Sequence, residues 1–521
     1  MRLRALWRGA RYAKRLLKAP IDPTRCSAIV QARVAERERA FFEMLERAVF
    51  AHPDSPYRPL LDAAGYDLPR IKALVAEGGI ETTLRRMRDD GVYVSIEEFK
   101  GIHEARRGER VFRFGERAFD NPLTRFGLVA SSGGTRSSGI PTTIPVDDQR
   151  MGAEHLMLAL SAYGLHTAPV IVWLSDAHGA SLWAVLALAT ARNTPPKWFT
   201  QLPPKFGDAS ERYLRYLGVR LCSRLYGIHL PPATHVAIGQ ESRILEWITG
   251  DLGHNACGVF TTPSSALRLA LAARRAGASL AHVSFVTIGE PLTPMKFAAI
   301  RTVGARAFSS LGFTEFGRVT YGCVAPIGID DGHVCSDAVA VIQRRRAVDH
   351  LGTEVDAYLF TALRSDARKI LVNMETGDYG TMTVRRCGCP LDRVGWTVHL
   401  QDIRSFEKLN AEGRLFFGSQ IISLVEERLP QQFGGDPTDY QLVEEEDEEG
   451  HTRLSLVAHP RLGPLDEEAV LACVGETFSA LADLSGSVWA DAGTIKVRRA
   501  APMLTKAGKL MPLHHLRGTR K

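Results

Sequence analysis

The pattern of apolar and polar positions divides the chain into stretches of different texture. Through residues 21–120 apolar side chains recur at helical spacing, as in AERERAFFEMLERAVFAH, with Pro and Gly between the runs, which predicts mainly helices. Residues 121–145 predict a short apolar strand, a Ser/Gly/Thr-rich loop and then Pro. From there to about residue 343, short apolar runs such as APVIVWL and HVSFVTIGE alternate with segments of helical periodicity. This alternation predicts an α/β domain with a mainly parallel sheet.

The pattern changes twice more towards the carboxyl end. Residues 337–400 read as strands and turns, with VAVIQ, AYLF and YGTMTVRR as the clearest strands. After Arg404 the tail predicts a strand pair around the acidic run EEEDEEG, a helix in DEEAVLACVGETFSALADL and a strand in TIKVRR. We therefore place a domain boundary near Arg404, with a small α+β domain after it.

Composition narrows the class of protein. Of the 521 residues 45% are hydrophobic and 24% are charged, which is ordinary for a globular protein and argues against disordered and coiled-coil classes. The chain contains no run of 18 apolar residues, so the sequence predicts no transmembrane helix. Its 8 cysteines are too few for a disulfide scaffold. We expect a cytoplasmic protein.

The net charge is +7, and much of the excess lies in the first twenty residues, MRLRALWRGARYAKRLLKAP. This segment predicts either a solvated N-terminal helix or a basic amphipathic helix lying on a membrane or an acidic partner. The positive balance suits anionic ligands such as nucleotides.

A loop rich in Gly, Ser and Thr, LVASSGGTRSSGIP, begins at Leu128 after a short apolar run. Glycines allow close approach of the backbone, and successive N–H groups with hydroxyls form a concave site for phosphates. The pattern is not GxxxxGK[ST], so the usual P-loop is excluded. An ordinary flexible linker remains the alternative for this loop alone.

Four further motifs follow in a specific order: TIGEPLTP at 287–294, FSSLGFTEFG at 308–317, METGDYG at 374–380 and APMLTKAGKLMP at 501–512. With the loop, this series resembles the adenylate-forming superfamily of acyl-CoA ligases, and within it the phenylacetate–CoA ligase-like branch. SSGGTRSSGIP is similar to the family's SSGTTGKPT, SLGFTE to YGxTE, and FFGSQIISLVEERL to FPSQIEEVL. The resemblance covers roughly residues 85–517.

The resemblance implies a fold and a division of the chain. The expected fold is α/β, with a large adenylate-forming domain of mainly parallel sheets over residues 85–403, joined by a hinge to a small mobile α+β domain over 404–521. Residues 1–84 would form a helical extension packed on the large domain. The active site would lie in the cleft between the two domains, where ligand sites commonly form.

The resemblance also implies a chemistry: a carboxylate reacts with ATP to form an acyl- or aryl-adenylate with release of pyrophosphate, and a thioester with coenzyme A follows. Charge builds on phosphoryl oxygens, so the protein positions groups and stabilises charge. The phosphate loop would hold the β- and γ-phosphates through Ser131, Ser132, Gly133, Thr135 and Gly139.

The other motifs would complete the nucleotide site. Glu315 offers the hard carboxylate oxygen that Mg²⁺ prefers, and Thr314 would contact the α-phosphate, with Gly312 and Phe313 of the same motif nearby. Asp378 would accept hydrogen bonds from both ribose hydroxyls. The wall beside the adenine would be made by Gly289, Glu290 and Pro291.

The tail motif implies a catalytic lysine, Lys509, which would reach the bridging oxygen and the carboxylate during adenylation. Lys506, three residues away, stays an alternative. Arg404 in IRSFEKL would match the family's hinge arginine, and Glu407 its acidic hinge residue. Several positions depart from the family: Arg136, Ser137 and Ser138 are extra residues in the phosphate loop, Ile140 stands in place of a lysine, and Leu311 in place of a tyrosine.

Cys323, His333, Cys387 and Cys389 are residue types that bind Zn²⁺ tetrahedrally, and the CGCP turn lets both thiolates of the Cys-x-Cys pair face one point. The phenylacetate–CoA ligase-like branch resembles this arrangement. Four protein ligands leave no open position, so the zinc would be structural. Cys335 competes with His333 as a ligand, and the alternative remains that these four residues are unrelated.

The predicted activity is a carboxylate–CoA ligase that uses ATP and Mg²⁺ on a small carboxylic acid. The alternatives are transfer of the acyl group to a carrier protein or an amine, and a catalytically impaired scaffold of the same fold. We expect no nucleic-acid partner, and leave a homodimer open beside a monomer. Trp183, Trp198 and Phe199 are candidates for an acyl pocket or for the core.

Overall fold

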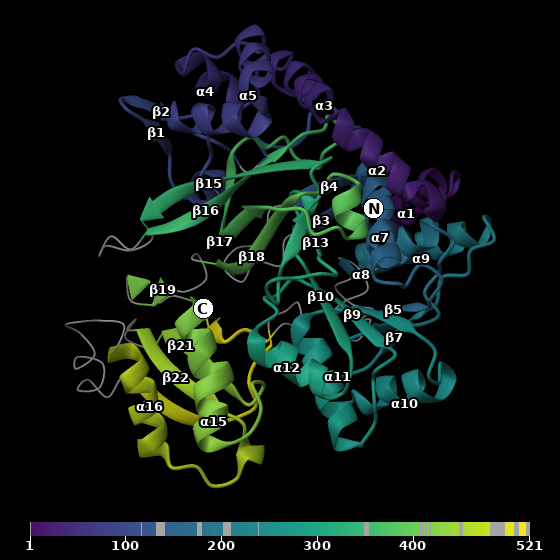
Figure 1. Ribbon diagram of the computed structural model, residues 1–521, viewed down its shortest axis with the longest axis vertical. Coiled ribbons are helices and arrows are strands. Elements are labelled where there is room, and N and C mark those ends of the chain that lie inside the picture. The colour runs from purple at the N-terminus through teal and green to yellow at the C-terminus, as the bar shows by residue number, and fades with distance from the viewer. Residues whose placement is uncertain are drawn as a thin grey trace.

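The structure is a computed structural model. It describes residues 2–516 except 116, 132–140, 175–179, 202–209, 238, 348–353, 406–409, 412–413, 416–417, 447–451, 480–494 and 505–509. Figure 1 shows a parallel-sheet region with helices on both faces, an antiparallel sheet under the N-terminal helices, and a separate C-terminal unit.

The first region contains a six-stranded, all-parallel sheet in the order β10-β9-β8-β5-β6-β7. Its strands are β5 (Val170–Leu174), β6 (Trp198–Thr200), β7 (Ala233–His235), β8 (Cys257–Thr261), β9 (Val283–Ile288) and β10 (Arg306–Ser310). The helices between them are α8 (Ala180–Thr190), α9 (Ser210–Arg224), α10 (Ser242–Asp251), α11 (Pro263–Arg275) and α12 (Pro294–Thr302). The predicted strand–helix alternation is confirmed here.

The strands β5, β8 and β9 are buried on both faces because helices cover both. Along β5, Val170, Val172 and Leu174 join the core that also contains α7 (Val146–Ala162) and α8. The intervening Ile171 and Trp173 join the core on the other face, with α10, α11 and α12. Alternate side chains point to opposite faces of a strand, so a parallel strand covered on both sides reads as one continuous apolar run.

The second region is a six-stranded antiparallel sheet in the order β13-β14-β18-β17-β16-β15. Its strands are β13 (Thr320–Gly322), β14 (Gly332–Val334), β15 (Val339–Ala347), β16 (Glu354–Ala362), β17 (Met374–Val384) and β18 (Val398–Ser405). The short α13 (Pro390–Arg393) lies between the last two. Two hairpins precede this sheet in the chain, β3 (Gly127–Ser131) with β4 (Pro141–Pro145), and β11 (Gly312–Phe313) with β12 (Gly317–Arg318).

Helices from the N-terminal part cover one face of the antiparallel sheet (Figure 1). They are α3 (Arg37–Met44), the π-helix η2 (Leu45–Phe50), α4 (Tyr57–Ala63), α5 (Leu68–Asp89) and α6 (Ile96–Phe99). Their apolar side chains share a core with Ile342 and Leu359 of the sheet. Residues 105–107 and 110–112 form a small antiparallel pair, β1 (Ala105–Arg107) and β2 (Arg110–Phe112), where the sequence predicted mainly helix.

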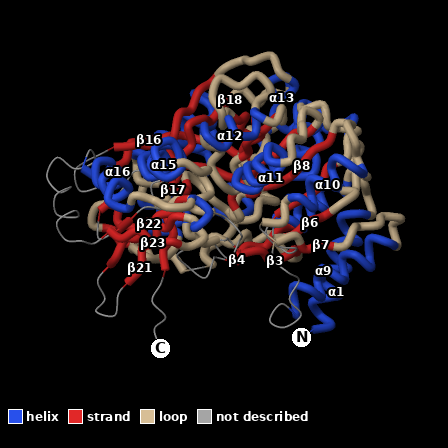
Figure 2. Tube along the Cα trace, turned by 90° about the horizontal axis from the view of Figure 1, so that it is seen from below, coloured by secondary structure: helices blue, strands red, loops and turns tan. Residues whose placement is uncertain are grey.

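The basic N-terminal segment forms α1 (Arg2–Leu17), which packs closely along α9 (Figure 2). The two backbones approach at Gly9 and Gly218: a Cβ built on Gly218 would lie 2.1 Å from the carbonyl oxygen of Leu6. Tyr12 and Leu16 are buried, whereas the arginines and lysines of α1 face outward. The apolar side of this amphipathic helix is thus covered by the protein itself.

The C-terminal unit has its own core, formed only by residues between Ile421 and Leu513 among those described. A four-stranded sheet, β23-β22-β21-β24, packs against helices. The elements are α14 (Gly418–Ser423), the π-helix η3 (Leu424–Arg428), α15 (Leu429–Phe433), β21 (Tyr440–Glu446), β22 (Thr452–Ala458), α16 (Glu467–Ser479), β23 (Ile495–Arg499) and β24 (Leu513–Leu516). The domain boundaries and the hinge at Arg404 stay predictions.

Within the described residues, no helix is long and apolar enough to cross a membrane.

Candidate active site and metal centre

The GEPL motif directly follows β9 at the carboxyl edge of the parallel sheet. Gly289 adopts φ 80°, a backbone conformation that favours glycine, and turns the chain out of the strand. Glu290 then accepts hydrogen bonds on Oε2 from the backbone N–H of Ser264 (3.0 Å) and from its hydroxyl. Because Ser264 lies in the first turn of α11, the Glu290 carboxylate is held at the positive end of that helix.

The SLGFTE motif forms the β11–β12 hairpin, which a buried ion pair supports from beneath. Arg368 donates from Nε to Asp148 Oδ2 (2.7 Å) and from Nη1 to the carbonyl oxygen of Thr314 (3.1 Å). Gly317 in this hairpin has φ 79°, and a Cβ built there would lie 3.0 Å from Arg368 Nη2. The turn that carries Thr314 and Glu315 is therefore positioned by a paired guanidinium.

Glu315 is half-buried at the tip of this hairpin. Burial raises the pKa of the Glu315 carboxyl, and the charges of Lys369, Arg368 and Lys100 oppose that rise. Among the described residues no lysine or arginine nitrogen pairs directly with it, since Arg368 pairs with Asp148 and Lys369 with Asp120. A partly exposed carboxylate without a direct counter-ion fits the donor chemistry of a Mg²⁺ ligand.

Asp378 and Arg404 lie on neighbouring strands. Asp378 on β17 stands opposite Ser405 on β18, and Tyr379 stands opposite Arg404. Thr376 donates a hydrogen bond to Asp378 Oδ2 (3.4 Å), and Arg404 donates to the carbonyl oxygen of Ile403 (2.8 Å). The predicted ribose ligand and the predicted hinge arginine thus occupy the same end of the antiparallel sheet.

The tail motif is held in place by a buried glutamine. Leu504 and Leu510 form an antiparallel bridge on either side of the segment that carries the two candidate lysines. Gln441 on β21 donates to the carbonyl oxygens of Met503 and Met511 (both 2.8 Å) and accepts from the Met503 N–H (2.7 Å). Gln441 therefore fixes both ends of this segment.

A pocket brings three of these distant segments together. Its lining comes from the GEPL motif, the start of α12, the end of β18, α14 with η3, and the tail. The lining residues are Glu290, Pro291, Thr293, Lys296, Arg404, Ser405, Ile421, Ile422, Glu426, Leu510, Met511, Pro512 and Leu513.

A buried ion pair closes one side of this pocket. Lys296 on α12 lies 2.9 Å from Glu426 on η3, and both side chains are at most 6% exposed. Thr293, the N-cap of α12, donates its hydroxyl hydrogen to the same carboxylate. The C-terminal unit is thereby joined to the parallel-sheet region through a desolvated contact.

Several predicted residues lie outside the described part of the chain: Ser132, Gly133, Thr135, Gly139, Lys506, Lys509, Ile140 and Glu407. Ser131 is the last residue of β3, with Pro141 opposite it on β4, so the strands on both sides of the phosphate loop are defined. The roles assigned to all these residues stay predictions.

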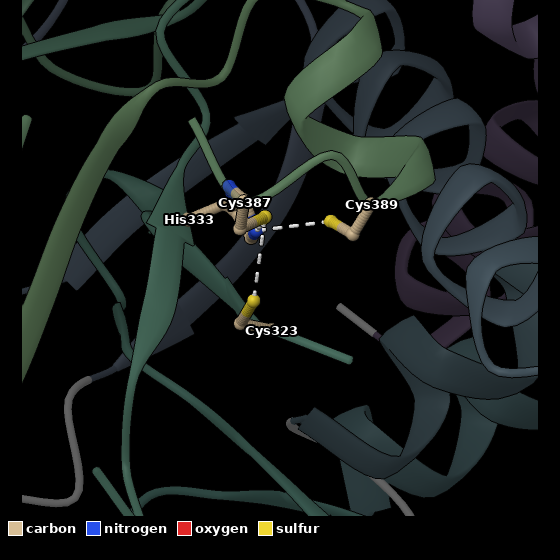
Figure 3. Close-up of side chains that lie close together, drawn as sticks. All are labelled: Cys323, His333, Cys387 and Cys389. Carbon is tan, nitrogen blue, oxygen red and sulfur yellow. Dashed lines mark hydrogen bonds between the residues drawn. The ribbon is translucent and has the colours of Figure 1, made fainter. Parts of the chain in front are cut away.

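The four predicted metal ligands come together in one cluster (Figure 3). Cys323 follows β13, His333 lies on β14, and Cys387 and Cys389 flank Gly388, whose φ of 75° turns the chain so that both thiols face His333. The Sγ atoms of Cys323 and Cys387 are 3.7 Å apart, and His333 Nε2 lies 3.6 Å from Cys387 Sγ and 3.2 Å from Cys389 Sγ.

These separations fit a tetrahedral ion. Zn–S bonds of about 2.3 Å and Zn–N bonds of about 2.0 Å imply S–S edges near ~3.8 Å and S–N edges near ~3.5 Å. A hydrogen bond with the Cys323 thiol, together with His333, lowers the pKa of the Cys389 thiol, so the cluster favours a thiolate there. The donor set and its spacing therefore suit Zn²⁺ bound by four protein ligands.

Further residues orient the cluster from outside. His333 donates from Nδ1 to the carbonyl oxygen of Trp396 (2.6 Å), which leaves Nε2 as the lone-pair nitrogen that faces the thiols. Arg385 lies 3.6 Å from Cys323 Sγ and pairs with Asp331, which accepts a hydrogen bond from His399 (2.7 Å). Such second contacts fix the ligand's tautomer and balance the thiolate charge.

Cys335, the competing ligand, stands outside this cluster. The β14 strand ends at Val334, where the chain turns with a hydrogen bond from the Ser336 N–H to the Val334 carbonyl (2.8 Å). Cys335 is fully buried, and burial raises the pKa of its thiol. The structure thus assigns the imidazole of His333 to the cluster.

Some functional candidates were not predicted from the sequence, namely Arg368 with Asp148, Lys296 with Glu426, and Gln441. Each is a buried polar side chain. The sequence pattern does not reveal which residue pairs with each of these buried polar side chains. Trp183, Trp198 and Phe199 are all buried, and Trp198 donates its ring N–H to Ser181.

Comparisons with known proteins place this geometry among solved folds. No protein-family model and no curated protein matches the chain. Solved structures do match. A 2-hydroxyisobutyryl-CoA ligase in complex with 2-HIB-AMP and CoA is 16% identical, with a TM-score of 0.45, over 94% of this chain and 90% of that one.

Two further matches have lower TM-scores. An anthranilate CoA ligase in complex with anthranoyl-AMP is 15% identical (TM-score 0.40) over 73% of this chain and 65% of that one. The A-PCP structure of McyG complexed with phenylalanyl-adenylate is 10% identical (TM-score 0.43) over 85% of this chain and 72% of that one. At such identities and TM-scores these structures carry no argument about this chain's activity, and the phenylacetate–CoA ligase-like branch stays a prediction.

Proposed function

We propose that this protein is an ATP-dependent carboxylate ligase, which forms an acyl- or aryl-adenylate with release of pyrophosphate and then a thioester with coenzyme A. The observation that carries the proposal is the pocket in which the GEPL motif, the Arg404 strand end and the tail beside Lys509 meet. These segments are far apart in the sequence, and a shared pocket is what a common substrate site requires.

The chain's own residues would act by position and charge. Asp378 would accept hydrogen bonds from the ribose, and Glu290 and Pro291 would form the wall beside the adenine. Glu315 would hold Mg²⁺, which supplies charge neutralisation at the phosphoryl oxygens. Arg368 holds the hairpin of Thr314 and Glu315 through Asp148, so these groups need little rearrangement when the reaction begins.

The tail lysine would be delivered by its anchored segment. Gln441 and the Leu504–Leu510 bridge hold both ends of residues 505–509, so a lysine there extends from a fixed base. A flexible stem with a compact ammonium suits a charge that must approach the carboxylate and the bridging oxygen. We assign this role to Lys509 rather than Lys506 on the motif's resemblance.

The proposed Zn²⁺ would have a structural role. Cys323, His333, Cys387 and Cys389 would occupy all four positions of a tetrahedral ion, so no position is left for a substrate or water. The ion would join β13, β14 and the loop before α13 at the base of the antiparallel sheet.

The test is carboxylate-dependent ATP–pyrophosphate exchange over a panel of aryl, fatty and amino acids, with Mg²⁺ present. We expect exchange with one class of acid, and a loss of about 100-fold or more in Lys509→Ala, the scale of removing one transition-state charge contact. The matched control is Lys496→Ala, an exposed lysine on β23, which should exchange at the wild-type rate.

A second measurement names the acceptor. AMP release that depends on coenzyme A supports the thioester step, whereas transfer only to a carrier protein or an amine replaces it. Undiminished exchange by Lys509→Ala with loss in Lys506→Ala reassigns the catalytic lysine. Absence of exchange with every acid, despite binding of ATP, overturns the enzyme in favour of a scaffold.

A further inference from the structure

Arg318 lies beside the predicted catalytic hairpin but has no assigned role. It stands directly opposite Gly312 on the paired strands β11 and β12, three residues after Glu315. A Cβ built on Gly312 would lie 3.5 Å from Arg318 Nη1, so the guanidinium fills the space that this glycine leaves. Three residues span at most about 10 Å, so Arg318 is close to the proposed reaction centre.

The Arg318 guanidinium sits among aromatic rings. Its Cζ is 5.3 Å from the ring centre of Trp183, 5.5 Å from that of Phe260 and 5.7 Å from that of Tyr321. These rings come from α8, β8 and β13. Burial lowers the pKa of Arg318, yet among the described residues no carboxylate lies within ion-pair distance of it. The rings attract the cation, and the hydroxyl oxygen of Tyr321 also interacts with it.

Arg368, which contacts the same hairpin, provides the comparison. It is buried, and its guanidinium is balanced by Asp148 at 2.7 Å and by the Thr314 carbonyl at 3.1 Å. A buried guanidinium of this kind is normally paired, because an unpaired buried charge is strongly unfavourable. The charge of Arg368 is thus balanced by a protein carboxylate, whereas no carboxylate of the described residues balances that of Arg318.

Among the described residues, three hydrogen-bond donors around this cage have no acceptor. They are the Nε of Arg318, the indole Nε1 of Trp183 and the hydroxyl of Tyr321. The Trp183 and Tyr321 side chains are 9% and 0% exposed, so bulk water does not readily satisfy them. Buried polar groups are almost always hydrogen-bonded, and three orphaned donors around one cation describe a site for an acceptor-rich, anionic group.

We propose that Arg318, Trp183 and Tyr321 bind a second carboxylate, or an equivalent anionic acceptor, at the far end of the acid, so that the substrate is a short dicarboxylic or similarly anion-bearing acid. This inference rests on the proposed function, because it places the distal group of the same acid that is adenylated near Glu315. The apolar middle of such an acid would lie against the rings of Trp183 and Phe260, which surround the Arg318 guanidinium.

The experiment compares α,ω-dicarboxylic acids of four to ten carbons with the monocarboxylic acids of equal length. Binding to the full chain is measured by isothermal titration calorimetry with Mg²⁺ and α,β-methylene-ATP, which cannot be cleaved to the adenylate. ATP–pyrophosphate exchange is measured in parallel. Arg318→Met and Arg318→Lys are tested beside a matched control, Arg344→Met. In the wild type, Arg344 on β15 also stacks on an aromatic ring, with its Cζ 4.2 Å from the ring centre of Tyr93.

We expect one dicarboxylate to bind the wild type at least ~10-fold more tightly than its monocarboxylate, the scale of hydrogen bonds to a charged group. Arg318→Met should abolish this preference, Arg318→Lys should retain part of it, and Arg344→Met should retain it fully. Melting curves establish that each variant is folded.

Two results overturn the inference: equal binding of mono- and dicarboxylates at every length, including no binding of either, or a dicarboxylate preference that survives in Arg318→Met. The two proposals fail separately. Exchange with monocarboxylates that is indifferent to Arg318 leaves the ligase and removes this site. Arg318-dependent dicarboxylate binding without exchange leaves this site and removes the ligase.

Discussion

The metal cluster and the pocket beside Arg404 are both assembled from residues far apart in the sequence, but they are built in different ways. The four cluster ligands lie on or next to strands of one antiparallel sheet and in the loop that joins β17 to β18, and their ligand atoms all lie within 4.8 Å of one another. The pocket is lined by segments from two separate hydrophobic cores, the parallel-sheet region and the C-terminal unit.

This difference matches the roles that we propose for the two sites, structural for the cluster and catalytic for the pocket. The cluster has every ligand supplied, an imidazole oriented by the Trp396 carbonyl, and no position left over. The pocket has its borders supplied by a buried ion pair and by a glutamine that holds the tail. A site between two cores can change its shape when the cores move, whereas a site within one sheet cannot.

The largest expected effect comes from breaking the cluster. Cys389→Ser should lower bound zinc from about one equivalent to near zero and reduce the free energy of unfolding by about 4 kcal/mol or more, because loss of a structural metal is among the most damaging changes. Zinc content by mass spectrometry and thermal melting measure both effects. Cys335→Ser, in the same region but outside the cluster, should keep its zinc. A wild type that melts unchanged without any metal would falsify the structural role.

The next effect concerns the ion pair that closes the pocket. Glu426→Gln leaves Lys296 buried without its counter-ion, so we expect a loss of about 3–5 kcal/mol in denaturant unfolding. The control is Arg274→Ala, which removes an exposed pair with Asp436 between the same two regions and should cost within ~1 kcal/mol. Equal losses in both variants would show that burial does not distinguish these contacts.

A smaller effect should appear in the tail. Gln441→Leu removes three hydrogen bonds to Met503 and Met511 and frees both ends of the lysine segment. We expect kcat for pyrophosphate exchange to fall about 10-fold, because misplacing a catalytic group by a small distance is costly. KM for ATP should change little. Gln432→Leu, at an exposed position on α15, is the control; a purely structural role for Gln441 would instead lower stability without changing kcat.

The smallest effect depends on pH and lies behind the cluster. Burial alone would raise the pKa of Asp337, but His155 (2.8 Å) and Arg33 lower it below its ordinary value. The charged carboxylate therefore stabilises the fold fully above the ordinary carboxyl pKa of about 3.9, and this stability is lost as pH falls through the lower folded value. The difference in unfolding free energy between wild type and Asp337→Asn should be constant from about pH 7 to 5 and shrink below that. A difference that grows on acidification would contradict the assignment.

Much of the fold followed from local pattern. The all-apolar run of β5, buried on both faces, and the alternation of strands with helices were enough to predict a parallel sheet. The order of the motifs was enough to predict a nucleotide-dependent ligase as a hypothesis. At residues 105–112 the helical prediction was wrong, because Arg110 and its neighbours pair across a turn at Gly108 and carry little periodicity of their own.

The candidate site includes contacts that the sequence alone does not predict. Residue type and the Cys-x-Cys turn determined that a metal cluster was plausible, and the sequence alone named its four ligands, but only the turn after Val334 decided that His333 and not Cys335 belongs to it. The pairing of Arg368 with Asp148, of Lys296 with Glu426, and the absence of such a pairing for Arg318 among the described residues are tertiary facts. Periodicity reports which face of an element is buried. The partner of a buried charge is chosen by segments hundreds of residues away, and only the packed chain brings them within hydrogen-bond distance.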